Sequence, residues 1–313
     1  MSVPHIKDCV LLIDKPSGYT SFDIIHRIRK TLKVKKCGHA GTLDKFASGL
    51  LIVCLGWATR LVPFVMGMDK RYIATMQLGV ATDTHDSEGQ VISKSNIQCT
   101  VEDIQSCLQT YFTGEIMQVP PDYSAIKING KRSSDRVRKG ELVAIAPRPV
   151  HIHKITVIDF DTACSQLTLD ITCSKGTYIR ALARDLGLRL HTGAHVIALR
   201  RIAIGDFSVT DALTVEQCIE LSHKNIEDMR GIVTPFRALG NFGVIAVKPD
   251  SLIKIKHGKL LGYDDITHVA GEPVFRVVPE GTEDLVALAV KDEKGYRCKK
   301  VFIEELDKID TMK

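Results

Sequence analysis

The residues best suited to chemistry lie in a glycine-rich segment between two apolar runs. Residues 36–50 read KCGHAGTLDKFASGL, and Gly38, Gly41 and Gly49 bracket His39 and Asp44. Glycine lets the backbone approach a ligand closely, and loops on a rigid scaffold often carry functional side chains. Such a loop is suited to presenting the Asp44 carboxylate to a bound ligand. The structural alternative is that Asp44 caps a following helix, and spacing alone leaves both interpretations open.

Other catalytic patterns are incomplete. Ser124-Ala-Ile-Lys127 matches the S-x-x-K of serine acylases, but residues 175–177 read K-G-T rather than K-T-G. Thr192 excludes the zinc motif H-E-x-x-H at His191 and His195, and no nucleotide phosphate loop is present. The nine cysteines include no C-x-x-C and are typical of reduced thiols in a cytosolic protein. We therefore expect neither a cofactor nor a metal site.

Length and charge limit the class of protein. The chain has 313 residues, enough for about two domains, and 42 Lys and Arg against 37 Asp and Glu. No apolar run approaches the length of a membrane span, and the first residues lack the features of a secretion signal or a transit peptide. These features predict a soluble cytoplasmic protein that does not bind membranes.

The positive charge is concentrated in one segment. Residues 127–148 contain seven Lys and Arg against one Asp and one Glu, a net +5 that equals the excess of the whole chain. The surrounding segment, about 119–148, begins with Pro120-Pro121, ends with Pro147-Arg-Pro149 and is poor in large apolar residues. A basic insertion is suited to contacting nucleic acid phosphates, although a charged run can also be an ordinary solvated loop.

The elements that must position these residues follow from hydrophobic periodicity. We expect buried strands at 10–13 and 50–55, alternating strands at 72–79 and 167–173, and short strands at 243–247, 273–278, 285–290 and 296–303. We expect helices from Ser21, which acts as N-cap, and over about 58–66, 100–114 and 178–190. The irregular mixture predicts an α+β or mixed α/β fold, with a small β domain after about residue 241.

Six ordered blocks between about residues 10 and 205 resemble the TruB family of pseudouridine synthases. Gly38-His-Ala-Gly-Thr-Leu-Asp44 is similar to that family's G-H-x-G-x-L-D catalytic loop, and Leu12-Ile-Asp-Lys-Pro-Ser-Gly-Tyr-Thr-Ser21 to its first motif. The other four blocks are 69–86 (D-K-R-Y, then L-G-V-A-T-D-T-H-D), Q-V-P-P-D-Y-S-A-I-K at 118–127, S-K-G-T-Y-I-R at 174–180 and G-A-H-V-I-A-L-R-R at 193–201. The chain departs from the family at Lys45-Phe46, where Pro-Leu is usual, and at 133–135, where Ser-Ser-Asp replaces an aromatic-Glu pair.

The resemblance implies a fold, a reaction and roles for individual residues. The fold is a mixed, largely antiparallel sheet flanked by helices over residues 1–240, followed by a PUA-like RNA-binding domain over 241–313. The reaction isomerises a uridine that has left its stack, without a cofactor. Asp44 is then the essential carboxylate, acting as nucleophile or as base, and Arg180 is the cation that keeps it ionised. Five residues are expected around the uridine: His39, Tyr72, Asp86, Tyr178 and Leu199.

The basic insertion indicates which RNA is modified, because guide-RNA-dependent relatives lack it. The resemblance therefore implies a stand-alone tRNA pseudouridine-55 synthase that recognises the T-stem-loop by shape, as a monomer without an obligate protein partner. The rival interpretations are a guide-RNA-dependent subunit and a non-catalytic RNA-binding or chaperone protein of the same fold. Seven basic residues are expected on the RNA backbone: Lys15, Arg60, Lys127, Lys131, Arg132, Arg136 and Arg138.

Overall fold

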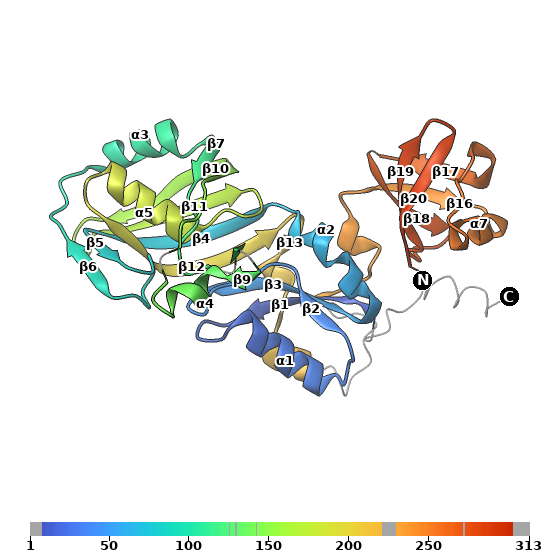
Figure 1. The fold of residues 1–313 in the computed structure, drawn as a ribbon, viewed down its shortest axis with the longest axis horizontal. Coiled ribbons are helices and arrows are strands. Elements are labelled where there is room, and N and C mark those ends of the chain that lie inside the picture. Colours follow the sequence, from blue (N-terminus) through green and yellow to red (C-terminus); the bar gives the residue numbers. More distant parts are fainter. Residues whose placement is uncertain are drawn as a thin grey trace.

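The computed structural model describes residues 8–124, 126–128, 130–141, 143–220, 230–271 and 273–302. Figure 1 shows two lobes, a large one built on an extended sheet and a small one containing the last strands. The large sheet has the path β14-β1-β3-β12-β4-β11-β10-β7, and β2, β13 and β15 pair beside it. Among the described residues of this sheet, neighbouring strands run antiparallel except for the pairs β1–β14 and β3–β12, which run parallel. The predicted mixed, largely antiparallel α+β fold is confirmed.

The four strands and four helices predicted for the large lobe are present, whereas its other strands and the helices at 133–137 and 215–220 were not predicted. Its strands are β1 (Val10–Lys15), β2 (Cys37–His39), β3 (Ser48–Leu55), β4 (Lys70–Leu78), β5 (Val80–Thr82), β6 (Val91–Lys94), β7 (Gly114–Gln118), β8 (Lys127–Ile128), β9 (Lys131–Arg132), β10 (Arg148–Asp161), β11 (Gln166–Cys173), β12 (Ala194–Ile204), β13 (Phe207–Ser208), β14 (Leu213–Thr214) and β15 (Ile232–Val233). Its α-helices are α1 (Ser21–Thr31), α2 (Val62–Met66), α3 (Val101–Tyr111), α4 (Ser133–Val137), α5 (Ile179–Arg189) and α6 (Val215–Glu220).

Both faces of the sheet are covered, which explains the continuous apolar runs of β1 and β3. Side chains alternate along a strand, so Leu11 and Val53 pack with α1 and α6, whereas Leu12 and Ile52 pack with the segment around Trp57 on the other face. The helices α3 and α5 cover the sheet over β4, β11 and β12 (Figure 1). The site therefore rests on a layered core.

The cap of α1 differs from the prediction. Thr20, rather than Ser21, is the N-cap, and it forms a capping box with Asp23. The Ser21 hydroxyl is therefore available for bonds to the loop that contains Asp44.

The small lobe is a five-stranded sheet in the order β17-β16-β18-β19-β20. Its elements are β16 (Gly243–Val247), α7 (Leu252–Lys256), β17 (Ile266–Ala270), β18 (Val274–Pro279), β19 (Ala287–Asp292) and β20 (Gly295–Val301), of which α7 and β17 were not predicted. The lobe shares a core with the large one, because Leu285, Leu288 and Phe302 pack in the cluster that contains Trp57. Among the described residues, no helix has the length and apolar composition needed to cross a membrane.

Candidate active site

Asp44 lies in the loop between β2 and β3, and no helix follows it, so the helix-capping alternative is wrong. The backbone of this loop is tied to the segment before and at the start of α1. The Ser21 hydroxyl accepts a hydrogen bond from the Leu43 N–H at 2.9 Å, and the Gly18 N–H donates to the Lys45 carbonyl at 2.9 Å. The Ser17 hydroxyl donates to the Phe46 carbonyl at 2.7 Å. The first motif therefore fixes the loop that presents the carboxylate.

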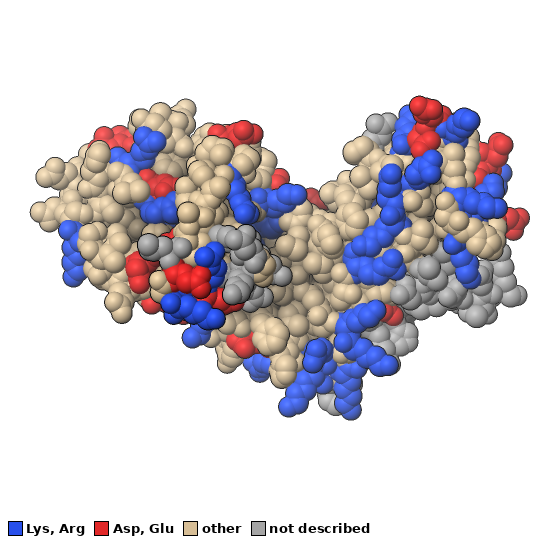
Figure 2. Space-filling model, viewed as in Figure 1, with Lys and Arg blue, Asp and Glu red and all other residues tan. Residues whose placement is uncertain are grey.

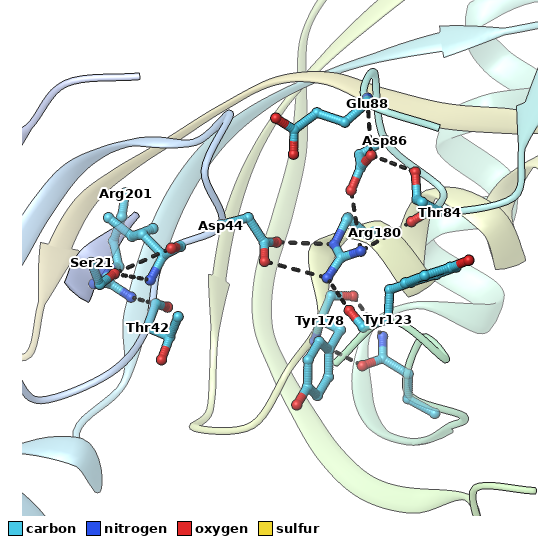
Figure 3. Close-up of polar contacts among 12 residues, drawn as sticks. Ser21, Thr42, Asp44, Thr84, Asp86, Glu88, Tyr123, Tyr178, Arg180 and Arg201 are labelled. Carbon is cyan, nitrogen blue, oxygen red and sulfur yellow. Dashed lines mark hydrogen bonds and ion pairs between the residues drawn. The ribbon is translucent and has the colours of Figure 1, made fainter. Parts of the chain in front are cut away.

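Arg180 lies against Asp44 and is buried (Figure 3). Its Nε is 2.9 Å from Asp44 Oδ2, and its Nη2 donates to Asp44 Oδ1 at 3.3 Å. The same guanidinium lies 3.1 Å from Asp86 Oδ2 and donates to the carbonyls of Thr84, at 3.1 Å, and Tyr123, at 2.9 Å. A planar cation with several fixed donors can hold a carboxylate in one orientation, which a flexible ammonium group does less well. Arg180 can therefore orient Asp44.

The Asp44 carboxylate is in a partly desolvated position. The Asp44 side chain is 39% exposed, so a substrate can reach the carboxylate from one side. Protein atoms surround the carboxylate on its other sides. This desolvation raises the pKa of Asp44 above its ordinary value, while the Arg180 charge lowers it. The arginine thus opposes the cost of burial and favours the charged form that either proposed chemical role requires.

The side chain of Asp86 lies against Arg180, which differs from the expectation that it reaches the displaced nucleotide. Its side chain is buried, pairs with Arg180, and accepts hydrogen bonds from the Thr84 hydroxyl and from the Glu88 N–H. A buried guanidinium needs compensating charge, and Asp86 supplies it from the side opposite Asp44. Asp86 is thus a buried partner of the arginine.

The structure places the other predicted pocket residues on neighbouring elements. Tyr72 on β4 and Leu199 on β12 are both buried in the core cluster that includes Leu43, and their strands pair directly. Tyr178 immediately precedes α5 and is partly buried, close to Arg180 (Figure 3). His39 ends β2 and is also partly buried. Burial and the nearby Arg201 charge lower its pKa, so the imidazole is neutral near pH 7.

Two buried residues that the sequence did not single out support this site. Arg201 donates from Nε to the Leu50 carbonyl at 2.7 Å and from Nη2 to the Gly41 carbonyl at 3.1 Å, so it holds the back of the loop. Gln118 makes a pair of hydrogen bonds with the backbone N–H and carbonyl of Tyr178. Both residues lie within the motif blocks, but nothing in their spacing distinguishes them from surface polar residues.

We expect Arg201→Met to destabilise the protein by about 2–5 kcal/mol, because it leaves buried carbonyls without donors. The adjacent Arg200 is a matched control. It is partly exposed and forms an ion pair with Asp14, so Arg200→Met should cost about 1 kcal/mol or less. Urea unfolding measures both, and equal losses for the two variants would show that Arg201 is not a support of the loop.

Comparisons with known proteins agree with this arrangement. A family model described as the N-terminal domain of TruB family pseudouridylate synthase matches residues 29–179, and one described as the tRNA pseudouridylate synthase B C-terminal domain matches 180–239. The chain is 36% identical over 305 residues to tRNA pseudouridine synthase B of Corynebacterium glutamicum (strain R), covering 97% of this chain and 98% of the relative. The chain belongs to the TruB family.

Two further likenesses support this assignment to TruB. Over 215 residues the chain is 46% identical to tRNA pseudouridine synthase B of Arthrobacter sp. (strain FB24), which covers 67% of this chain and 70% of the relative. A solved Cbf5-Nop10-Gar1 complex has a chain that matches with a TM-score of 0.74 and 26% identity, covering 95% of this chain and 85% of that one. The fold of that chain therefore extends over nearly the whole of this one.

Lys15, in the first TruB motif, does not lie where an RNA phosphate could reach it, so that expectation is wrong. Its side chain is fully buried, and Nζ donates to the carbonyls of Pro16 at 3.0 Å, Tyr19 at 2.7 Å and Lys45 at 3.4 Å. Burial lowers the pKa of Lys15 to about 8. Lys15 instead joins the first motif to the loop that contains Asp44.

Arg60 is partly buried and contacts the last strand of the small lobe. Its Nη2 donates to the Val301 carbonyl at 2.7 Å, and its guanidinium lies 5.1 Å from the centroid of the Phe302 ring. Lys300 donates to the Arg60 carbonyl at 2.7 Å. Arg60 thus joins the two lobes, and its use as a phosphate contact stays a prediction.

The basic insertion of this TruB chain folds as the β8–β9 hairpin followed by α4. Its beginning reaches the active site, since the Tyr123 carbonyl accepts from Arg180. Arg138 is exposed, and Arg136 pairs with Glu141 at 2.6 Å. The side chains of Lys127, Lys131 and Arg132 lie outside the part of the structure that is described. Within the described residues, no group of three or more His, Cys, Asp or Glu could hold a metal ion.

Proposed function

We propose that this protein is a tRNA pseudouridine synthase that isomerises uridine 55 in the T-loop of tRNA. The observation that carries the proposal is the pair of Asp44 and Arg180 at a partly open position within a TruB chain. A non-catalytic relative would have no use for an oriented carboxylate of this kind. The presence of the insertion between β7 and β10 favours a stand-alone tRNA enzyme over a guide-RNA-dependent subunit.

The residues of the site support a base-flipping reaction. A uridine that leaves its stack can lie against Tyr72, with Tyr178 and Leu199 around it and the neutral His39 at its edge. Asp44 then faces the sugar or the base with its charge maintained by Arg180. The glycosidic C–N bond breaks, the base turns, and a C–C bond forms at C5 as the C5 proton leaves. Either role of Asp44, attack on the sugar or removal of a proton, requires the ionised form.

We also propose a division of labour between the lobes. Residues 1–240 carry the reaction, and residues 241–313 form a PUA-like domain that binds tRNA outside the T-stem-loop. The proposal includes action as a monomer, without an obligate protein partner, in the cytoplasm. The core shared around Trp57 supports a fixed placement of the two lobes, so that one tRNA can contact both.

The proposed reaction is tested by incubating the pure protein with a T-stem-loop transcript whose uridines carry tritium at C5. Tritium release equivalent to one uridine per RNA is expected, because forming the C5–C bond expels the C5 hydrogen. Replacing the target uridine by cytidine should remove this release. Failure of the wild-type protein to release tritium from both the stem-loop and whole tRNA would refute the proposed function.

The insertion should carry part of the RNA affinity. Replacing Lys131, Arg132, Arg136 and Arg138 by Ala should make the slope of log K against log salt less steep by up to about 3.5, since each lost phosphate contact removes about 0.7–0.9. The loss should be similar for the stem-loop and for whole tRNA. The control is the double variant Lys94→Ala/Lys154→Ala, which changes exposed residues on β6 and β10. It should leave the slope unchanged. An unaltered slope in the insertion variant would mean that these cations do not contact the RNA.

A further inference from the structure

The outer face of α1 has an unusual combination of side chains. Its inner face buries Ser21, Ile24, Ile25 and Ile28 against β1 and β3. An α-helix turns by about 100° per residue, which places Phe22, His26, Arg29 and Lys30 on the opposite side. All four are exposed. We call these four residues, together with the exposed Lys33 just beyond the helix, the α1 face.

This face is strongly positive. Residues 21–36 contain six Lys and Arg and a single acidic residue, Asp23, which is a net +5 and equal to that of the insertion. Asp23 is already used by the capping box with Thr20. In the described part of the chain, the cations Arg29, Lys30 and Lys33 form no ion pair. Figure 2 shows Lys and Arg side chains gathered over α1. The unpaired charge makes the α1 face complementary to a polyanion.

Aromatic rings lie beside these cations. Phe22 is 71% exposed, and its ring is stacked on His26 with centroids 6.5 Å apart. Tyr19 is also exposed, and the Arg27 guanidinium lies 5.7 Å from its ring centroid. Exposed rings next to unpaired cations are the combination that nucleic-acid-binding surfaces use for bases and phosphates together. This favours RNA over an acidic protein as the occupant.

The position of α1 determines which part of an RNA could reach it. Ser21, the first residue of α1, bonds to Leu43 next to Asp44, whereas Tyr123 of the insertion bonds to Arg180 on the other side of Asp44 (Figure 3). From Ser21 the helix extends about 16 Å away from the site, a length of about five phosphate steps along one strand of a duplex. An RNA held by the insertion with its target base at Asp44 would meet the α1 face only by continuing past the site.

We propose that the α1 face binds the sugar-phosphate backbone of the tRNA outside the T-stem-loop. This inference rests on the proposed function and adds a second basic surface, on the side of Asp44 away from the insertion. It assigns phosphate contacts to Arg29, Lys30 and Lys33 and a stacking contact to Phe22.

The test compares Arg29→Gln/Lys30→Gln/Lys33→Gln with a control of equal charge change, Lys94→Gln/Lys154→Gln/Arg189→Gln. The control residues are exposed on β6, β10 and α5, away from α1 (Figure 1). Affinity for unmodified whole tRNA should fall roughly 10- to 100-fold at 0.1 M salt in the α1 variant. Its slope of log K against log salt should become less steep by about 2–3. Affinity and single-turnover rate on the isolated T-stem-loop should stay at the wild-type value. Phe22→Ala should weaken binding of whole tRNA while leaving its salt slope unchanged.

Two results would overturn the inference. Unchanged affinity of the α1 variant for whole tRNA would show that RNA does not use this face, and an equal loss on the stem-loop would show that the contact lies within the stem-loop. Wild-type turnover on the stem-loop tests the proposed function separately, because it does not depend on the α1 substitutions. Thermal melting of both triple variants verifies that the exposed substitutions leave the fold intact.

Discussion

Asp44→Asn is expected to abolish pseudouridine formation while leaving RNA binding in place. Asparagine is nearly isosteric with aspartate, and the loop backbone is held by Ser21, Arg201 and Lys15 through bonds that do not involve the carboxylate. The amide can neither attack the sugar nor take a proton, so the single-turnover rate should fall by at least about 10⁴-fold. Arg180 remains neutralised by Asp86 in this variant, which preserves the fold of the site.

The measurement is tritium release from C5-labelled uridine with enzyme in excess, together with filter binding of the same RNA. Asp159→Asn, at an exposed position on β10, is the matched control and should behave as wild type. A folded Asp44→Asn protein that retains near-normal single-turnover rates would falsify the assignment of Asp44 as the essential carboxylate.

The second large effect is expected from Arg180→Lys. Lysine keeps the charge, but one ammonium group cannot reach Asp44, Asp86 and the two carbonyls that the guanidinium contacts. The single-turnover rate should fall by roughly 10²–10³-fold, with binding nearly unchanged. Because Arg180 lowers the pKa of Asp44 against the effect of burial, weakening the pair should raise that pKa. The reaction needs the ionised carboxylate, so the acidic limb of the pH–rate profile should move to higher pH.

Arg184→Lys is the matched control for this substitution. Arg184 lies one turn further along α5, where it pairs with the neighbouring Asp185 and donates to the Val119 carbonyl. It should show a small change in rate and no shift of the acidic limb. Arg180→Gln should shift the limb further than Arg180→Lys, because it removes the charge altogether. If the rate falls in both Arg180 variants while the limb stays in place, Arg180 positions Asp44 without setting its ionisation.

Local patterns predicted several of the elements, because hydrophobic periodicity and caps act within a few residues. The buried strands β1 and β3, the helix α3 with its Thr100 cap and the short strands of the small lobe lie close to the predicted ranges. The missed elements include the two longest strands, β10 and β12, as well as short ones such as α7 and β17. The side of the sheet that each element covers was not predictable, since it depends on contacts between residues far apart in the chain.

The sequence by itself determined the family and the reaction and led to the roles proposed for Asp44 and Arg180, because motif blocks preserve residue type and spacing. Only the tertiary structure decided what each polar side chain contacts. Lys15 and Arg60 looked like phosphate ligands, yet Lys15 is enclosed by carbonyls of two loops and Arg60 lies between the lobes. Asp86 proved to be a second counter-charge for Arg180. Whether a charge faces solvent, RNA or another buried charge depends on neighbours supplied by distant segments, and buried charges require such partners.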